Sequence, residues 1–484
     1  MKNIYERVES LLGVDARSLG LFRIALGVIL LCDLIIRSFS LRAHYTDQGI
    51  VSRHVLKGLS DNPLLLSLNM LSGDPLWQWL LFFLAACFAV CLIIGYRSQW
   101  ACFGCLVLML SIHVRNPFVN NLGDWFLLHL LFWGCLLPLG VRFSLDARRK
   151  RALRQLPTQI LSIATLGILV QIAALYFFSV FKKNSPEWHT DGTAVHYALR
   201  LDRFVTDIGE WVLSLPYDWL TAMTSATLFL EQWGPILLFV PFFIGPIRIA
   251  LVSCFVLFHT GLALTLELGI FPFVCISAWF LVLPGMFWDR IVPFRNKKPW
   301  RHRLTTTKRA PDDVSLSFVL NTVLATFMLL IMVSGNLLYI EKMSVAYYEG
   351  LYKYVEPLTN SLNMKQRWSM FSPHPSRQDG WVVLAGIKED GTMIDLWRNG
   401  QPVTWERPED ISALYRNQRW RKNLEYVTTK WDRHAQLLGA YSLREWNESQ
   451  EEKVTKVLVY FMSELEVGPE ESSAVSRKLL YAAE

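Results

Sequence analysis

The chain contains 484 residues, of which 52% are hydrophobic and only 18% are charged. This composition excludes an ordinary soluble protein and indicates a polytopic membrane protein. The formal net charge of +7 does not indicate nucleic-acid binding, because the Lys and Arg residues gather in short segments between apolar runs, where they set membrane topology.

The N-terminal two thirds of the chain are predicted to form an all-α polytopic membrane domain. A membrane span needs about 20 apolar residues, and fewer when it is buried among other helices. The first 17 residues are polar and amphipathic, with no evident signal-peptide cleavage site after the apolar run that follows. We predict nine spans, at residues 18–38, 76–96, 99–114, 122–141, 158–181, 219–244, 247–266, 270–288 and 315–339.

Two basic segments, residues 141–154 and 289–309, predict the orientation of these spans. Lys and Arg are enriched in cytoplasmic loops, and the two segments follow the fourth and the eighth predicted span. We therefore expect a cytoplasmic N-terminus. The loops at 39–75 and 182–218, and everything after residue 340, are then expected on the outer side.

The chain after residue 340 has a different character. The stretch GWVVLAGIKEDGTMIDLWRNG predicts two strands around a Glu-Asp-Gly turn, and KVTKVLVYFMSELEV predicts a further strand. Between them, the segment from Pro408 to Trp446 predicts a helix. We expect a transmembrane domain over residues 1–340 and a small α+β extracytoplasmic domain over residues 341–484, with a loose polar tail from Gly468.

Several polar residues lie inside the predicted spans. A charge in the centre of a membrane helix costs about 2.5–3.5 kcal/mol on insertion scales, so Arg23 and Asp33 in the first span are expected to have partners. Asn121 and Asp124 lie at the outer start of the fourth span, and His259 lies in the middle of the seventh. Each of these residues is open to two interpretations, a structural contact between helices or the lining of a polar cavity.

The stretch YFFSVFKKNSPEW ends the fifth span with Lys182 and Lys183. A lysine at the end of a span commonly extends its ammonium group to the membrane surface. A lysine buried in the mouth of a cavity can instead lose its proton and act as a general base. The residues alone leave both interpretations open. The sequence contains no HxxxH motif, and the CxxC stretch from Cys102 to Cys105 has no second such stretch to pair with, so we predict no metal site.

Four motifs follow one another in an order that resembles a known family. They are FRIALGVILLCD with Arg23 and Asp33, YTDQGIVSR, FKKNSPEW with Lys183 and Trp188, and FHTGLALTLELGIF with His259. The chain resembles the horizontally transferred transmembrane-domain (HTTM) family, the bacterial relatives of the vitamin K-dependent γ-glutamyl carboxylases. The resemblance covers about residues 15–340 and, more weakly, the stretch QRWSMFSPHPSRQDGW after the last predicted span.

The resemblance implies a function and a set of site residues. In the carboxylases, the second lysine of the pair deprotonates vitamin K hydroquinone. The implied site therefore has Lys183 as catalytic base and Arg23, Asp33, Asn121, Asp124, Trp188 and His259 as cavity-lining or supporting residues. Reduced vitamin K or another quinol is the implied cofactor, and a lipophilic small molecule is the implied substrate. The implied location is the lipid bilayer of a bacterial inner membrane.

Two features differ from the carboxylases. Leu122 follows the Asn120–Asn121 pair where the carboxylases have a histidine, and the outer domain is short and contains no cysteine. Full glutamyl carboxylation is therefore not expected, whereas deprotonation or epoxidation of a quinol-like substrate is. The alternative is a non-catalytic membrane scaffold that presents an envelope-binding domain to a partner protein.

Overall fold

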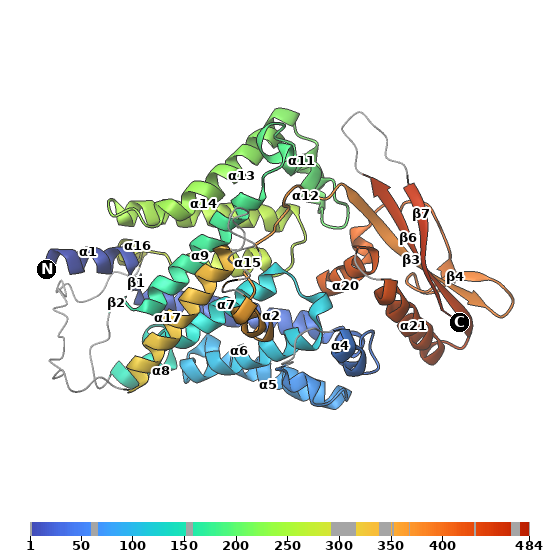
Figure 1. Ribbon diagram of the computed structural model, residues 1–484, viewed down its shortest axis with the longest axis horizontal. Helices are drawn as coiled ribbons and strands as arrows, with labels where there is room; N and C mark the ends of the chain where they lie inside the picture. Colours follow the sequence, from blue (N-terminus) through green and yellow to red (C-terminus); the bar gives the residue numbers. More distant parts are fainter. Residues whose placement is uncertain are drawn as a thin grey trace.

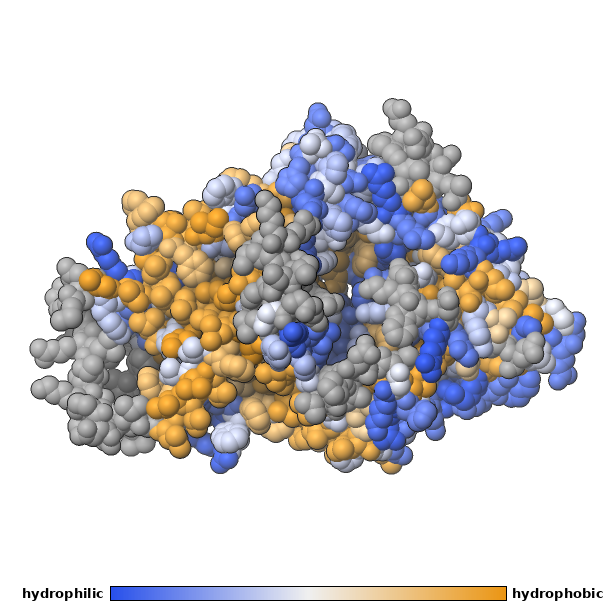
Figure 2. Space-filling view, viewed as in Figure 1, coloured by the Kyte–Doolittle hydropathy of each residue, from blue (hydrophilic) through white to orange (hydrophobic). Residues whose placement is uncertain are grey.

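In the computed structural model, the described residues are 2–59, 66–151, 158–291, 316–337, 350, 353–366, 368–429, 432–465 and 475–483. They form a helical region and, at one end of it, a smaller domain that contains a β-sheet (Figure 1). In the view of Figure 2 the helical region shows a largely apolar surface, and the sheet domain shows a largely hydrophilic one. This division fits a membrane domain joined to a domain in water.

The helical region is built from long apolar helices. Six helices in the described part of the chain are long and apolar enough to cross a membrane, or seven if one bent pair is a single span. The six are α2 (Ala16–Ser38), α5 (Pro75–Ile94), α6 (Ser98–Arg115), α9 (Ile163–Lys182), α14 (Ile244–Thr265) and α17 (Leu316–Leu337). The bent pair is α15 (Phe271–Phe280) and α16 (Gly285–Ile291), which meet at 88°. The predicted polytopic helical domain is thus confirmed.

Two further helices correspond to predicted spans. The helix α7 (Leu122–Leu136) is apolar but has only 15 residues, and α13 (Tyr217–Leu237) has 21 residues and contains a buried glutamate and Pro235. The number of nine spans therefore stays a prediction, as does their orientation. Most of the basic segment 289–309 lies outside the described residues.

Shorter elements connect these helices. They are α1 (Lys2–Leu12), α3 (Leu41–Tyr45), α4 (Arg53–Leu59), α8 (Leu145–Arg151), α10 (Pro186–His189), α11 (Ala194–Leu199), α12 (Asp207–Leu213) and α19 (Lys353–Ser361). A two-residue strand, β1 (Val14–Asp15), pairs with β2 (Gln159–Ile160) and so ties the start of α2 to the start of α9.

The C-terminal domain is an antiparallel sheet with helices packed against it. The strand order is β5-β4-β3-β6-β7. The strands are β3 (Gln378–Lys388), β4 (Met393–Asp395), β5 (Gln401–Pro402), β6 (Val454–Leu465) and β7 (Val475–Ala483), and the helices are α20 (Gln418–Thr429) and α21 (Asp432–Ser449). The helix α21 contacts β6 and β7. The predicted strand pair around the Glu-Asp-Gly turn, the later strand and the α+β class are all confirmed.

Two details of this domain were predicted wrongly. The helix expected from Pro408 begins only at Gln418, because the Asn417 side chain accepts the backbone N–H groups of Arg419 and Trp420 and so caps α20 there. The tail expected to be loose from Gly468 is ordered over residues 475–483, which form the strand β7, since their backbone pairs with β6 and Tyr481 packs against the core of the domain.

The two regions are packed closely together. Trp420 on α20 donates from Nε1 to Ser40 Oγ at 2.8 Å, directly after the end of α2. Gly269, between α14 and α15, has a φ of +64°, and a Cβ there would overlap the Gln418 side chain. The segment after α17 also returns into the helical region, where Trp368 is fully buried and donates to Asn336 Oδ1 at 3.1 Å. The C-terminal domain is therefore packed firmly against the helical region.

Candidate functional site

Lys183 lies at the point where α9 ends. The helix begins with a capping box between Ser162 and Thr165. It cannot continue far beyond Lys182, because Pro186 has no backbone N–H and restricts the residue before it. Lys183 takes a non-helical conformation, with φ of −86° and ψ of 61°. Lys182 is thus the last helical residue of α9, whereas Lys183 has left the helical conformation.

The side chains of the two lysines also differ in environment. Lys183 is 2% exposed, and its Nζ donates to Glu231 Oε2 on α13. The centre of the Trp188 ring lies 4.6 Å from the same Nζ, which is a cation–π distance. Lys182 is half-buried and donates from Nζ to Ser369 Oγ at 2.7 Å. The Lys183 amine is thus more deeply buried than that of Lys182, and it has a carboxylate partner on α13.

The short helix α10 holds Trp188 in place beside this pair. His189 Nε2 lies 2.7 Å from the Lys183 carbonyl oxygen, so α10 folds back against the end of α9. Trp188 donates from Nε1 to the Phe371 carbonyl oxygen at 2.9 Å. Phe371 belongs to the QRWSMFSPHP stretch, and this stretch therefore closes over the same region.

His259 lies deeper in the helical region than Lys183. Its Nε2 is 2.7 Å from the Tyr176 hydroxyl, which also accepts a hydrogen bond from Trp279 Nε1 at 2.9 Å. These contacts join α9, α14 and α15. Because Tyr176 precedes Lys183 by two turns of α9, the two side chains start about 10 Å apart along the helix axis. His259 is therefore a neighbour of the lysine site and makes no direct contact with it.

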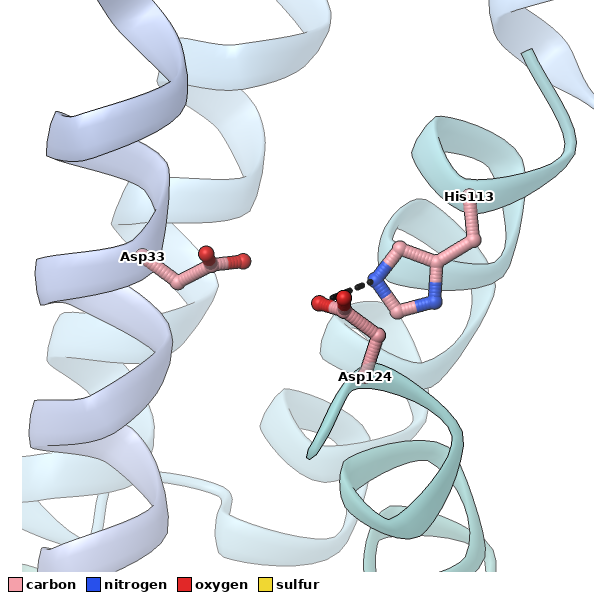
Figure 3. Close-up of side chains that lie close together, drawn as sticks. All are labelled: Asp33, His113 and Asp124. Carbon is pink, nitrogen blue, oxygen red and sulfur yellow. Dashed lines mark ion pairs between the residues drawn. The ribbon is translucent and has the colours of Figure 1, made fainter. Parts of the chain in front are cut away.

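A second buried cluster joins the four helices α2, α6, α7 and α20. Asp33 on α2 and Asp124 on α7 face each other, and His113 on α6 lies beside Asp124 with Nε2 3.5 Å from Oδ1 (Figure 3). Arg37 donates to Asp33 Oδ2 at 2.7 Å and to Asp124 Oδ1 at 2.5 Å. Arg419 of α20 donates to both carboxylates as well, with one distance of 2.8 Å to Asp124 Oδ1.

This second cluster balances its own charge. Two carboxylates face two guanidinium groups, and all four side chains are at most 1% exposed. Asp33, His113 and Asp124 lie close enough together to hold a metal ion, yet Arg37 and Arg419 occupy the carboxylate oxygens. A dication would have to displace guanidinium groups that cannot lose their charge. The arrangement is therefore a buried ion-pair network.

Asn121 extends this network to the C-terminal domain. Its backbone N–H donates to Asp124 Oδ2 at 2.6 Å, and its side chain accepts from the Asp124 N–H, which makes the capping box of α7. Its Nδ2 donates to Gln418 Oε1 at 3.0 Å. Asn121 and Asp124, which were expected to lie near a cavity, thus cap α7 and contact α20.

Arg23 lies apart from both clusters. Its guanidinium donates to the carbonyl oxygens of Leu92, of Ile93 at 2.8 Å and of Phe143 at 2.7 Å. Two of these carbonyl groups, those of Leu92 and Ile93, lie in the last turn of α5, and the third belongs to the loop before α8. Ten residues of α2, about 15 Å, separate Arg23 from Asp33. The structure does not bring Arg23 together with Lys183 or His259.

Several residues of these clusters were not among the predicted site residues: Arg37, His113, Tyr176, Glu231 and Arg419. Glu231 and Tyr176 lie on other helices or other turns, and neither spacing nor charge relates them to Lys183 in the sequence. Arg37 does have a signal, because it follows Asp33 by four residues and so shares its face of the helix.

Comparison with known proteins identifies the helical region. A family model of the HTTM domain matches residues 13–286, which include α2 to the start of α16 and contain Lys183, Glu231 and His259. No curated protein and no solved structure matches the chain. The C-terminal domain lies outside the matched residues.

Proposed function

Because the chain belongs to the HTTM domain family, we propose that it is a membrane-embedded enzyme in which Lys183 acts as a base on a lipid-soluble, quinol-like substrate. The observation that carries this proposal is the buried pair of Lys183 and Glu231 beside Trp188. A buried amine with an adjacent carboxylate can exchange a proton with it.

The pair can supply a neutral amine without leaving a lone charge behind. Burial disfavours charged groups, and an unpaired buried charge is costly. When the proton moves from Lys183 Nζ to Glu231 Oε2, both groups become neutral together. The amine then has a free electron pair and can accept the proton of a substrate hydroxyl.

The products of that step also suit the site. Proton transfer from the substrate turns Nζ into an ammonium group directly beside the new oxyanion. A fixed positive charge in a dry site stabilises such an anion strongly. Trp188 restricts the position of Nζ, and its ring face favours the cationic form through a cation–π contact. Glu231 keeps the proton that it received, so the transferred proton stays on the pair.

The proposed substrate is reduced vitamin K or another quinol dissolved in the bilayer. The resemblance to the carboxylases motivates this choice, and the largely apolar surface of the helical region suits a substrate that is dissolved in lipid. With molecular oxygen, the deprotonated quinol would give an epoxide and water. We propose a bacterial inner membrane as the location, with the N-terminus in the cytoplasm and α20 on the outer side.

The test is epoxide formation by the purified protein. Wild-type protein in lipid nanodiscs, supplied with reduced vitamin K and oxygen, should form epoxide that is measured by chromatography. Lys183→Ala should abolish the activity, and Lys182→Ala, the matched neighbour, should retain most of it. No epoxide from folded wild-type protein, or equal rates for both variants, would reject the vitamin K version of the proposal.

The ion-pair network favours a second candidate function, a membrane scaffold that presents its outer domain to an envelope protein. Arg419 anchors that domain to α2 and α7 by buried contacts, which suits rigid presentation. In that case, Lys183→Ala would leave the function of the protein in cells unchanged, whereas Arg419→Ala would impair it. The enzyme candidate predicts that both variants lose function.

A further inference from the structure

A groove lies where the end of α2 meets the outer domain. It has a volume of about 500 Å³, within the range of about 300–1,000 Å³ that is usual for small-molecule sites. Its walls come from the last turn of α2, from α3, from the residues before α20 and from α21. Since α2 is a membrane-spanning helix and α20 and α21 belong to the hydrophilic domain, the groove lies at the boundary between the two surfaces of Figure 2.

The membrane side of the groove is apolar. Ile36 and Phe39 line it, and Phe39 is 81% exposed. Ile35 and Val28, at 50% and 45% exposed, continue this apolar surface down α2. A phenylalanine so exposed beside a membrane span is favourable only where lipid or an apolar ligand covers it. The groove thus opens onto the part of α2 that faces lipid.

The C-terminal domain contributes an arginine and a glutamate to the groove. Arg416 lies over the Trp397 ring at 4.8 Å and the Trp420 ring at 5.5 Å, which holds its guanidinium in place. Glu445 lies on the opposite wall, on α21. Among the described residues, neither Arg416 nor Glu445 has an ion-pair partner.

The other groups of the groove fit the same pattern. Arg42 also lines it, but its guanidinium already pairs with Glu448 at 2.6 Å. Tyr441 contributes an aromatic ring beside Glu445, and burial, reinforced by the Glu445 carboxylate, raises the pKa of its hydroxyl to about 12. The wall therefore offers an unpaired cation, an unpaired anion and an aromatic ring next to an apolar channel.

We propose that this groove binds a glycerophospholipid with a zwitterionic headgroup. The Arg416 guanidinium would hold the phosphate, for which its planar fork of donors is suited. Glu445 and the Tyr441 ring would hold the headgroup ammonium, and an acyl chain would lie along Ile36 and Phe39. This site is separate from Lys183, so its test is independent of the proposed enzyme activity.

The experiment measures which lipid the protein retains. The full-length protein is first stripped of lipid. It is then mixed with equal amounts of phosphatidylethanolamine, phosphatidylcholine and phosphatidylglycerol that have identical oleoyl chains. After re-extraction, native mass spectrometry identifies the lipid that remains bound. We expect wild-type protein to retain one zwitterionic lipid about tenfold more than phosphatidylglycerol. Arg416→Ala and Arg416→Gln should lower this retention about tenfold, and Glu445→Gln should shift the preference towards phosphatidylglycerol.

Arg477 provides the matched control. It lies over the Trp405 ring at 4.5 Å on β7, outside the groove, so Arg477→Ala removes the same kind of stacked arginine and should retain lipid as the wild type does. Equal retention by the Arg416 and Arg477 variants would overturn the proposal, as would retention of phosphatidylglycerol at the level of the zwitterionic lipids. Either result would mean that only general membrane lipid surrounds the protein.

Discussion

The lysine cluster and the guanidinium network, both buried among the described helices, differ in the kind of cation that each uses. At the end of α9, the cation is the Lys183 ammonium group, for which we propose proton transfer to Glu231. Between α2, α7 and α20, the cations are the guanidinium groups of Arg37 and Arg419, which stay charged in proteins. Burial alone therefore does not mark a reactive site. The first cluster is suited to proton transfer, and the second is suited to holding two domains together.

The largest effect is expected from breaking the guanidinium network. Asp124→Asn removes one carboxylate and leaves two buried guanidinium groups with one partner, Asp33, that carries charge. Because neither arginine can become neutral, the free energy of unfolding should fall by about 3–5 kcal/mol. Thermal unfolding in detergent measures this loss. Arg416→Ala, which removes a nearby arginine at the surface, should stay within about 0.5 kcal/mol of the wild type.

Acid should weaken the same domain contact by a similar amount. His434 on α21 packs on Phe118 of the helical region with ring centres 4.9 Å apart. Burial lowers the pKa of His434 to about 4. The pKa of His44, which packs against Trp420, is lowered to about 3 by burial and by the charges of Arg37 and Arg419. The unfolded value is about 6.5.

Because folding depresses these pKa values, the unfolded state binds more protons in acid. Stability is then complete above about pH 6.5 and falls as the pH drops towards 4, by about 3 kcal/mol for His434. Limited proteolysis of the outer domain between pH 7 and pH 4 measures the effect. His434→Phe should flatten the profile, and a pH profile unchanged by this variant would contradict the assignment.

Breaking the lysine pair should cost less stability than breaking the network. Glu231→Gln leaves Lys183 without a carboxylate, but the amine can release its proton to water and become neutral. We expect a loss of about 1–3 kcal/mol, which is smaller than for Asp124→Asn, together with a loss of epoxidation. Equal stability losses for the two variants would mean that both clusters are held by fixed charges.

The smallest effect concerns the cap that links the network to α20. Asn121→Ala removes the capping side chain of α7 and the contact with Gln418, and should cost about 1 kcal/mol. Asn121→Ser keeps a capping oxygen and loses only the contact with Gln418, so it should cost less. The same unfolding measurement separates the two variants.

The sequence predicted the elements better than it predicted their partners. Long apolar runs and alternating apolar and polar residues are patterns within short stretches of sequence. The helical domain and the strands β3, β4 and β6 could therefore be predicted from them. The start of α20 could not, because a proline followed by acidic residues is as good a helix signal as the Asn417 cap that actually determines it.

The site residues divide in the same way. Asp33 and Arg37 share one helix face, so their pairing is readable. Arg419 joins Asp33 across 386 positions, and its neighbours Arg416 and Arg421 carry the same charge, so nothing local distinguishes the buried arginine. Glu231 becomes a partner of Lys183 only because α13 packs against α9. Such contacts depend on tertiary structure.

The central claim is that Lys183 acts as a base whereas the arginines of the network do not. The most direct test of this claim is the epoxidation rate of the Lys183→Arg variant. Arginine keeps a positive charge next to Glu231, so the pair and the fold should be retained, with unfolding close to that of the wild type. Because a guanidinium group cannot act as a base at neutral pH, the rate should fall by at least about 100-fold, while the control Lys182→Arg stays active. A Lys183→Arg protein that remains as active as Lys182→Arg would contradict the base role of Lys183.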